Sequence, residues 1–176
     1  MNVFWENGYR ATSVRQLEKA MKINQFSIYA SFKDKRNLFI ESLRKYRKHV
    51  RGSTFENLLK EDAGLNDIKK FFSDLAENIH EEKVIKGCLI VNTASEIGVK
   101  DKLIYKEVNN YFSSIKEMFK GILQRARARG EISSDADIDK YSNYLLGIMQ
   151  SLSLGMKVLD EKQLNDFISM ALVPIK

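Results

Sequence analysis

Three adjacent residues near the N-terminus have side chains suited to recognising the edges of DNA bases. Gln25 can form two hydrogen bonds with adenine, and Ser27 can contact a base or a phosphate. Phe26 lies between them, and it either packs against the methyl group of a thymine or is partly buried against the preceding turn. Base recognition of this kind requires a short helix whose outer face carries these side chains.

The N-terminal third of the chain is strongly basic. Residues 1–51 contain twelve Lys and Arg residues and four Asp and Glu residues, a net charge of +8, whereas residues 52–176 have a net charge of −2. A basic segment attached to a near-neutral body is typical of a protein that binds a polyanion. On charge alone, a merely solvated basic face is the alternative.

Local signals in this basic segment predict short helices joined by tight turns. Gly8 can end the first helix of the chain. Ser13 and Gln16 have the spacing of a capping box, and Asn24 and Asp34 are good N-terminal caps. The predicted helices therefore begin near residues 14, 25 and 35. The first two of these form a helix-turn-helix, whose second helix can enter the major groove of DNA.

At these residues the sequence resembles the tetracycline-repressor (TetR) family of bacterial transcription regulators. The positions that stand at that family's spacing are Phe4, Gly8-Tyr9, Thr12-Ser13-Val14-Arg15, Leu17, Ala20, Ile23, Ser27-Ile28-Tyr29, Phe32, Lys35 and Leu38. The resemblance implies a first helix that begins about ten residues before this chain does. One departure is Lys22, which occupies a turn position where the family usually has glycine.

The resemblance also implies roles for individual residues. The implied phosphate contacts are Thr12, Ser13, Tyr29 and Lys35. Helix N-termini with free amides suit that contact. The residues implied to read base edges are Gln25, Phe26 and Ser27. The alternatives are that Tyr29 is a core tyrosine and that Lys35 is a solvated charge.

The rest of the chain shows helical periodicity and no strand-like alternation, so we predict an all-α fold. Apolar residues repeat at helical spacing over about 66–82, 102–129 and 160–172. We predict a helix-turn-helix DNA-binding domain at 1–48, whose first helix is truncated, and a helical ligand-binding and dimerisation domain at 49–176.

A homodimer formed by the last two long helices is implied by the resemblance. Residues 137–158 are apolar around the whole helix, so this helix is either the centre of a monomer core or also lines a subunit interface, which we favour. The residues predicted at the interface are Leu145, Gly147, Ile148, Ser151, Leu152, Gly155, Leu164, Phe167 and Ile168.

A pocket for a small hydrophobic or mixed-polarity effector is expected among the helices of the body. The predicted lining residues are Phe71, Leu75, Cys88, Asn92, Tyr111, Phe112 and Met149. The alternative for each of them is plain core. We interpret Cys88, which stands among apolar residues, as an inert buried thiol, with a redox role as the alternative.

Catalysis is not expected from this sequence. The chain has two histidines, no glycine-rich phosphate loop and no Cys/His spacing of a metal site. Glu77 and His80 have the E-x-x-H spacing of di-iron bundles, but such a site needs two copies of the motif. We therefore expect neither a cofactor nor a metal.

Together with the basic helix-turn-helix segment, the resemblance implies a ligand-released repressor that binds a pseudo-palindromic operator of double-stranded DNA as a homodimer. The single cysteine and the lack of an apolar run of membrane-spanning length predict a cytoplasmic protein. The alternative function is a TetR-like ligand sensor with impaired or lost DNA binding.

Overall fold

The computed structural model describes residues 1–77 and 86–175, and every regular element in that part of the chain is helical. The all-α prediction is confirmed. The chain divides into two compact units, one comprising Met1–Val50 and Leu89–Tyr111 and the other comprising Arg51–Cys88 and Phe112–Lys176. The first unit therefore combines the basic N-terminal segment with a later stretch of the chain. No helix within the described ranges is both long and apolar enough to cross a bilayer.

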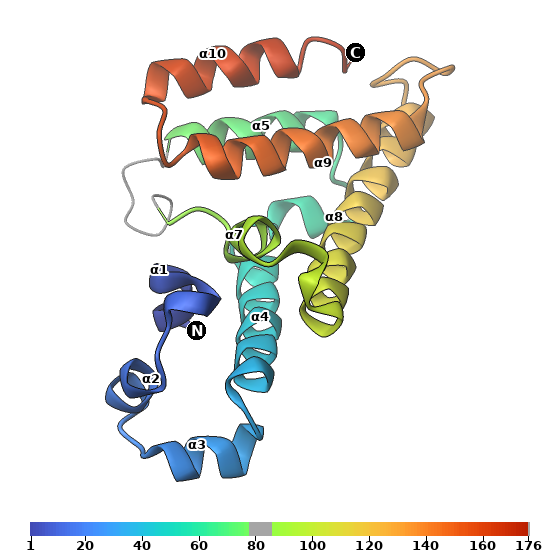
Figure 1. Cartoon of the computed structure of the whole chain (residues 1–176). Helices are drawn as coiled ribbons and strands as arrows, with labels where there is room; N and C mark the ends of the chain where they lie inside the picture. Colours follow the sequence, from blue (N-terminus) through green and yellow to red (C-terminus); the bar gives the residue numbers. More distant parts are fainter. Residues whose placement is uncertain (78–85, 176) are drawn as a thin grey trace. The chain divides into compact units, whose positions relative to one another are not determined.

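The first unit contains the helices expected of a helix-turn-helix head (Figure 1). Its elements are α1 (Asn2–Ala11), α2 (Val14–Met21), α3 (Gln25–Phe32), α4 (Lys35–Gly52), α7 (Leu89–Glu96), η2 (Gly98–Lys100) and the start of α8 (Lys102–Ala128). The predicted caps set the starts of α2, α3 and α4. The Ser13 and Gln16 side chains form the capping box. The side-chain Oδ1 atom of Asn24 accepts a hydrogen bond of 2.8 Å from the Ser27 amide. The Oδ1 atom of Asp34 accepts one of 2.7 Å from the Asn37 amide.

Gly8 interrupts the helical geometry of α1, as its position in the sequence predicts. Its backbone has φ 77° and ψ 174°, after which one further turn continues to Ala11. A side chain at this position would be strained by the positive φ, and its Cβ would lie 2.8 Å from the Oε2 atom of Glu96. The break leaves the amides of Tyr9 and Arg10 free to be capped by another residue.

Aromatic and aliphatic side chains form the core of the first unit. Phe4, Phe39 and Leu43 are buried, and the Phe4 and Phe39 ring centroids lie 4.9 Å apart in an edge-to-face arrangement. Leu17 from α2 and Ile28 from α3 are also buried. The apolar face of each short helix is thus used for packing, and its opposite face remains at the surface.

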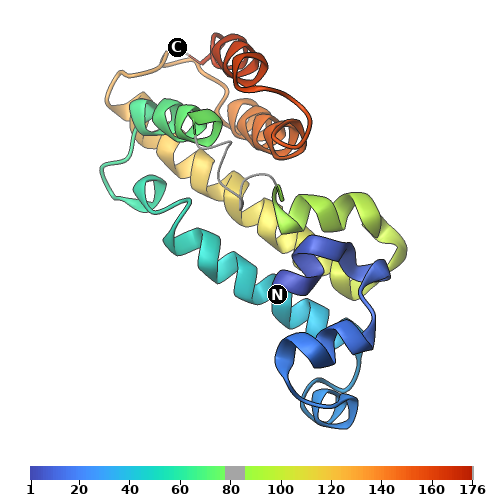
Figure 2. The ribbon, with the colours of Figure 1, turned by 90° about the vertical axis from the view of Figure 1, so that its left-hand side faces the viewer.

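The second unit is a helical bundle in which α10 packs against both α5 and α9 (Figure 2). Its elements are η1 (Asn57–Leu59), α5 (Leu65–Glu77), the part of α8 from Phe112, α9 (Ile138–Gly155) and α10 (Glu161–Ala171). Its core contains stacked and edge-to-face phenylalanine rings from Phe55, Phe71, Phe72 and Phe119, with centroid separations of 5.1–6.3 Å. These helices agree with the predicted apolar stripes.

Candidate nucleic-acid interface

Helix α3 buries one face and presents its first residues at the surface. Ile28 is 0% exposed, whereas Phe26 is 82% exposed and Gln25 is also exposed. Ser27 is half-buried. The alternative of a partly buried Phe26 is therefore wrong, and Gln25 and Phe26 stand where a ligand of α3 would meet them.

The N-terminus of α3 is held by two side chains, of which the sequence predicts only one. Asn24 caps the amide of Ser27, as predicted. In addition, the amide of Gln25 donates a hydrogen bond of 2.6 Å to Oε1 of Glu18 on α2. This contact links α2 to the first residue of α3. Glu18 could not be selected from sequence because it lies seven residues before Gln25 and has no capping spacing.

The turn between α2 and α3 places a lysine in a conformation that favours glycine. Lys22 has φ 57° and ψ 32°, in the left-handed region. A left-handed conformation costs a residue with a Cβ about 1–2 kcal/mol. The structure therefore explains why glycine suits this position and shows that the turn forms with lysine.

Lys22→Gly is expected to stabilise the fold by about 0.5–1 kcal/mol, because relief of this strain exceeds the added entropy of the unfolded chain. Thermal unfolding should show a midpoint about 1–4 °C higher. The matched control is Lys48→Gly at an exposed position inside α4, which should lower stability by about 1 kcal/mol. A decrease in the midpoint for Lys22→Gly would contradict the strain at this turn.

The four predicted phosphate contacts differ in their access to a ligand. Ser13 is exposed at the start of α2, and Tyr29 is half-buried on α3. Thr12 is 1% exposed, and its hydroxyl donates to the carbonyl of Gly8, so its side chain is not accessible to a phosphate. The sequence alone does not show whether a hydroxyl directly before the start of a helix faces inward or outward.

Lys35, the fourth predicted phosphate contact, is half-buried at the start of α4. Its Nζ atom lies 3.4 Å from the carbonyl oxygen of Arg10 and 4.8 Å from the ring centroid of Tyr9. Burial lowers the pKa of the Lys35 ammonium, and the nearby carboxylate of Glu96 opposes that shift. Lys35 therefore joins the start of α4 to the end of α1, and its contact with a phosphate stays a prediction.

Three carboxylates from residues 89–111 contact residues 1–50 of the same unit. We call Glu96, Asp101 and Glu107 the acidic row. Glu96 accepts hydrogen bonds from the amides of Tyr9 and Arg10 at 2.9 and 2.6 Å, so it caps the turn that follows Gly8. Asp101 lies 3.7 Å from Nη1 of Arg36. The row thus supplies negative charge to a segment whose net charge is +8.

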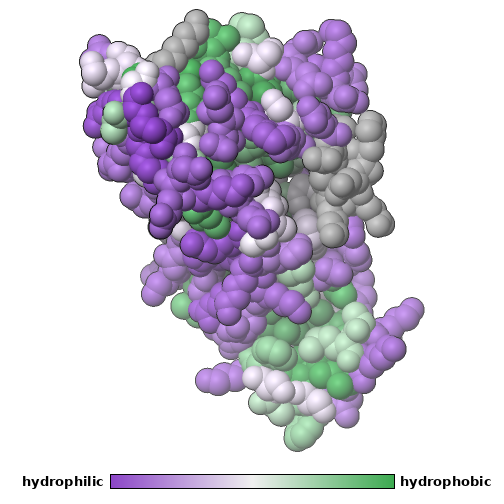
Figure 3. All heavy atoms as spheres, turned by 180° about the vertical axis from the view of Figure 1, so that it is seen from behind, coloured by the Kyte–Doolittle hydropathy of each residue, from purple (hydrophilic) through white to green (hydrophobic). Residues whose placement is uncertain are grey.

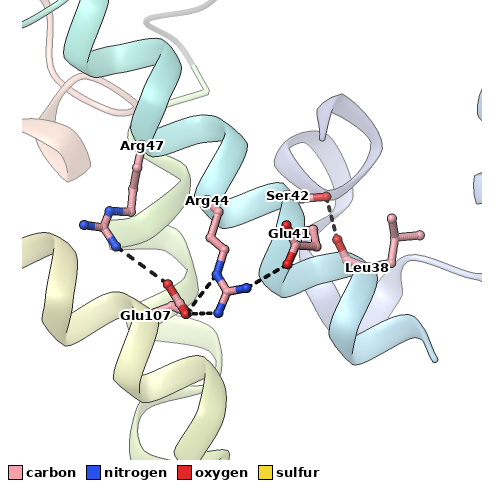
Figure 4. Close-up of polar contacts among 6 residues, drawn as sticks. All are labelled: Leu38, Glu41, Ser42, Arg44, Arg47 and Glu107. Carbon is pink, nitrogen blue, oxygen red and sulfur yellow. Dashed lines mark hydrogen bonds and ion pairs between the residues drawn. The ribbon is translucent and has the colours of Figure 1, made fainter. Parts of the chain in front are cut away.

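Glu107 makes the most buried contact of the acidic row (Figure 4). The residue is 7% exposed, and its Oε1 atom accepts hydrogen bonds from Nη2 and Nε of Arg44 at 2.6 and 3.1 Å. Its other oxygen lies 3.6 Å from Arg47, while Arg44 also reaches Glu41 at 2.7 Å. The hydrogen bond to Glu107 raises the pKa of the Arg44 guanidinium. Two arginines of α4 therefore contact Glu107 of α8, and both arginine side chains remain partly exposed to solvent.

Comparisons with known families agree with this geometry. Residues 64–172 match the model described as "Tetracyclin repressor-like, C-terminal domain", and residues 1–41 match the model described as "Bacterial regulatory proteins, tetR family". The chain belongs to the TetR family. It is accordingly a member of a family of transcriptional regulators, in agreement with the resemblance noted in the sequence.

Individual relatives match between 89% and 99% of the chain. An uncharacterised HTH-type transcriptional regulator of Bacillus subtilis, YezE, is 26% identical over 174 residues, covering 98% of this chain and 90% of that protein. The HTH-type transcriptional repressor ComR of Escherichia coli is 23% identical and covers 89% and 75%. A cysteine-substituted TetR family regulator, CifR, solved with a 26-bp double-stranded operator DNA, has a TM-score of 0.86 at 21% identity and covers 99% and 91%.

The predicted interface residues of this TetR-family body divide into buried and surface positions. Leu145, Ile148, Leu152, Gly155, Leu164 and Ile168 are buried within the protomer. Ser151 and Phe167 are exposed, and Gly147 is half-buried. Other apolar side chains of α9 and α10 are also exposed, among them Leu154 and Met170. A contact between copies would therefore involve these surface residues. The sequence pattern alone could not distinguish them from core residues, because α9 is apolar around its whole circumference.

The predicted pocket residues fall in both compact units. Asn92 and Tyr111 belong to the first unit, and the other five belong to the second. Phe71, Tyr111 and Met149 are buried, whereas Leu75, Cys88, Asn92 and Phe112 are half-buried. The ring of Phe71 packs in the phenylalanine core, and the amide of Cys88 donates to Oγ of Ser153 at 2.8 Å. His80, of the E-x-x-H pattern, lies outside the described residues.

Proposed function

We propose that this TetR-family chain represses transcription from the cytoplasm as a homodimer. In each protomer α3 enters the major groove of a pseudo-palindromic operator, and a small hydrophobic or mixed-polarity molecule bound in the body at about 49–176 releases the DNA. The observation that supports this most strongly is the exposure of the first two residues of α3, Gln25 and Phe26, in a segment of net charge +8. The complex of CifR with operator DNA supports the same use of the fold.

The binding partner is tested by titrating the whole protein against duplex DNA that flanks its own gene. Binding should weaken steeply as salt rises, because a protein with about six to ten phosphate contacts loses about 10³–10⁵-fold in affinity between 50 and 200 mM salt. The second candidate, a sensor that does not bind DNA, is favoured by the carboxylate of Glu18 at the start of α3. Absence of salt-dependent binding would select that candidate.

The roles of Lys35 and Gln25 give separable expectations. Lys35→Ala should weaken binding to all DNA sequences alike, whereas Gln25→Ala should relax preference at one base pair by about 1–3 kcal/mol. Affinities measured over a panel of single-base variants of one site check both expectations. The control Lys69→Ala removes an exposed lysine of α5 and should leave all affinities unchanged. Equal losses for Lys35→Ala and Gln25→Ala across the panel would refute the separate roles.

A further inference from the structure

Phe26 is the most exposed large hydrophobic side chain of the described residues. It is 82% exposed, compared with 76% for Val99 and Val158. Phe26 is the second residue of α3, and hydrogen bonds from the backbone to Asn24 and Glu18 hold the start of this helix. Exposure of a large aromatic ring is unfavourable in water, since burial of apolar area is what drives packing. The ring is therefore available for contact with a partner outside the protomer.

The surroundings of Phe26 favour a negatively charged partner. The segment that carries it has a net charge of +8. In the space-filling view, apolar and weakly polar residues gather over the region where Figure 1 places α3, with hydrophilic residues beside them (Figure 3). Duplex DNA matches both the apolar ring, through apolar groups on the base edges, and the positive charge of residues 1–51.

The major groove of DNA offers one apolar group on the base edges, the C5-methyl group of thymine. The other groups on those edges are hydrogen-bond donors and acceptors, which an aromatic ring cannot satisfy. Gln25 directly before Phe26 supplies the polar contact that adenine takes. A helix presenting Gln and Phe side by side therefore suits a T·A pair next to an adenine.

We propose that Phe26 packs against the methyl group of one thymine in each operator half-site and so sets the preference for T·A at that position. This inference rests on the proposed function, because it requires α3 to lie in the major groove. It assigns Phe26 a share of the sequence specificity rather than of the general affinity for DNA.

The test uses the whole protein and a duplex obtained by selection from random sequences with the wild-type chain. Each thymine is replaced in turn, in both half-sites, by deoxyuridine, which lacks only the methyl group. At one position the wild type should bind about fourfold more weakly per half-site, the factor that corresponds to the roughly 0.8 kcal/mol gained by burying one carbon group. Phe26→Ala should bind the unmodified duplex more weakly and should be insensitive to deoxyuridine at that position.

Two controls make the result specific to Phe26. Phe26→Ala should leave the midpoint of thermal unfolding unchanged, and Val99→Ala, which truncates another exposed apolar side chain, should retain the deoxyuridine effect. Wild-type binding that is salt-dependent but insensitive to every deoxyuridine would overturn the inference and leave the proposed function standing. If the wild type instead binds no DNA at all, the proposed function is refuted.

Discussion

Phe72→Ala is expected to lower the free energy of unfolding by about 3–5 kcal/mol, the usual cost of removing a phenylalanine ring from a well-packed core. Phe72 is 0% exposed, and its ring stacks on Phe119 with centroids 6.0 Å apart. Phe71 lies 5.1 Å away in an edge-to-face arrangement, so the truncation leaves a cavity lined by rings that cannot easily close it. Denaturant unfolding followed by far-ultraviolet circular dichroism measures the change.

Phe26→Ala provides the matched control for this experiment, because it removes the same ring from the surface. Its free energy of unfolding should stay within about 0.5 kcal/mol of the wild type. If Phe72→Ala also falls within that range, the second unit is not packed around its phenylalanine cluster. The pair thus separates a residue that stabilises the second unit from one that we propose for recognition.

Glu107→Lys is expected to lower the free energy of unfolding by about 2–4 kcal/mol and to weaken DNA binding. The lysine would place a cation where Arg44 and Arg47 now contact a carboxylate at 2.6 and 3.6 Å, at a position only 7% exposed. Breaking a fully buried ion pair costs about 3–5 kcal/mol, and the partial exposure of both arginines reduces that figure. Helix α4 directly follows α3, so loosening α4 also loosens the support of α3.

Glu117→Lys is the control for Glu107→Lys, since it makes the same change at an exposed position of α8. It should alter stability by no more than about 0.5 kcal/mol. Glu107→Gln, which keeps one acceptor oxygen for Arg44, should fall between the wild type and Glu107→Lys. Equal stability of the two lysine variants would show that the contact between Glu107 and α4 contributes nothing to the first unit.

Sequence predicted the local features of the head well because the interactions that define them are local. The hydroxyl of Ser13 and the side chain of Gln16 lie three residues apart, and their capping box is present as expected. The same holds for the caps at Asn24 and Asp34 and for the break in α1 at Gly8. Each of these features needs only a short stretch of chain to be recognised.

The acidic row could not be predicted, because its partners lie far away in the sequence. Glu96 caps an amide 87 residues before it, and Glu107 binds an arginine 63 residues before it. No spacing rule connects such positions, and an isolated Glu on a helix reads as a solvated charge. The burial of Thr12 could not be predicted either, since it depends on how α1 packs and not on the neighbours of Thr12 in the sequence.

Methylation interference on a selected duplex tests the central claim most directly, because guanine N7 is exposed in the major groove. The account predicts that N7 methylation blocks binding of the whole protein at two clusters of guanines, one in each half-site. The clusters should be separated by about one helical turn of 10 base pairs or a multiple of it. Binding that is unaffected by N7 methylation anywhere in the duplex would contradict the placement of α3 in the major groove.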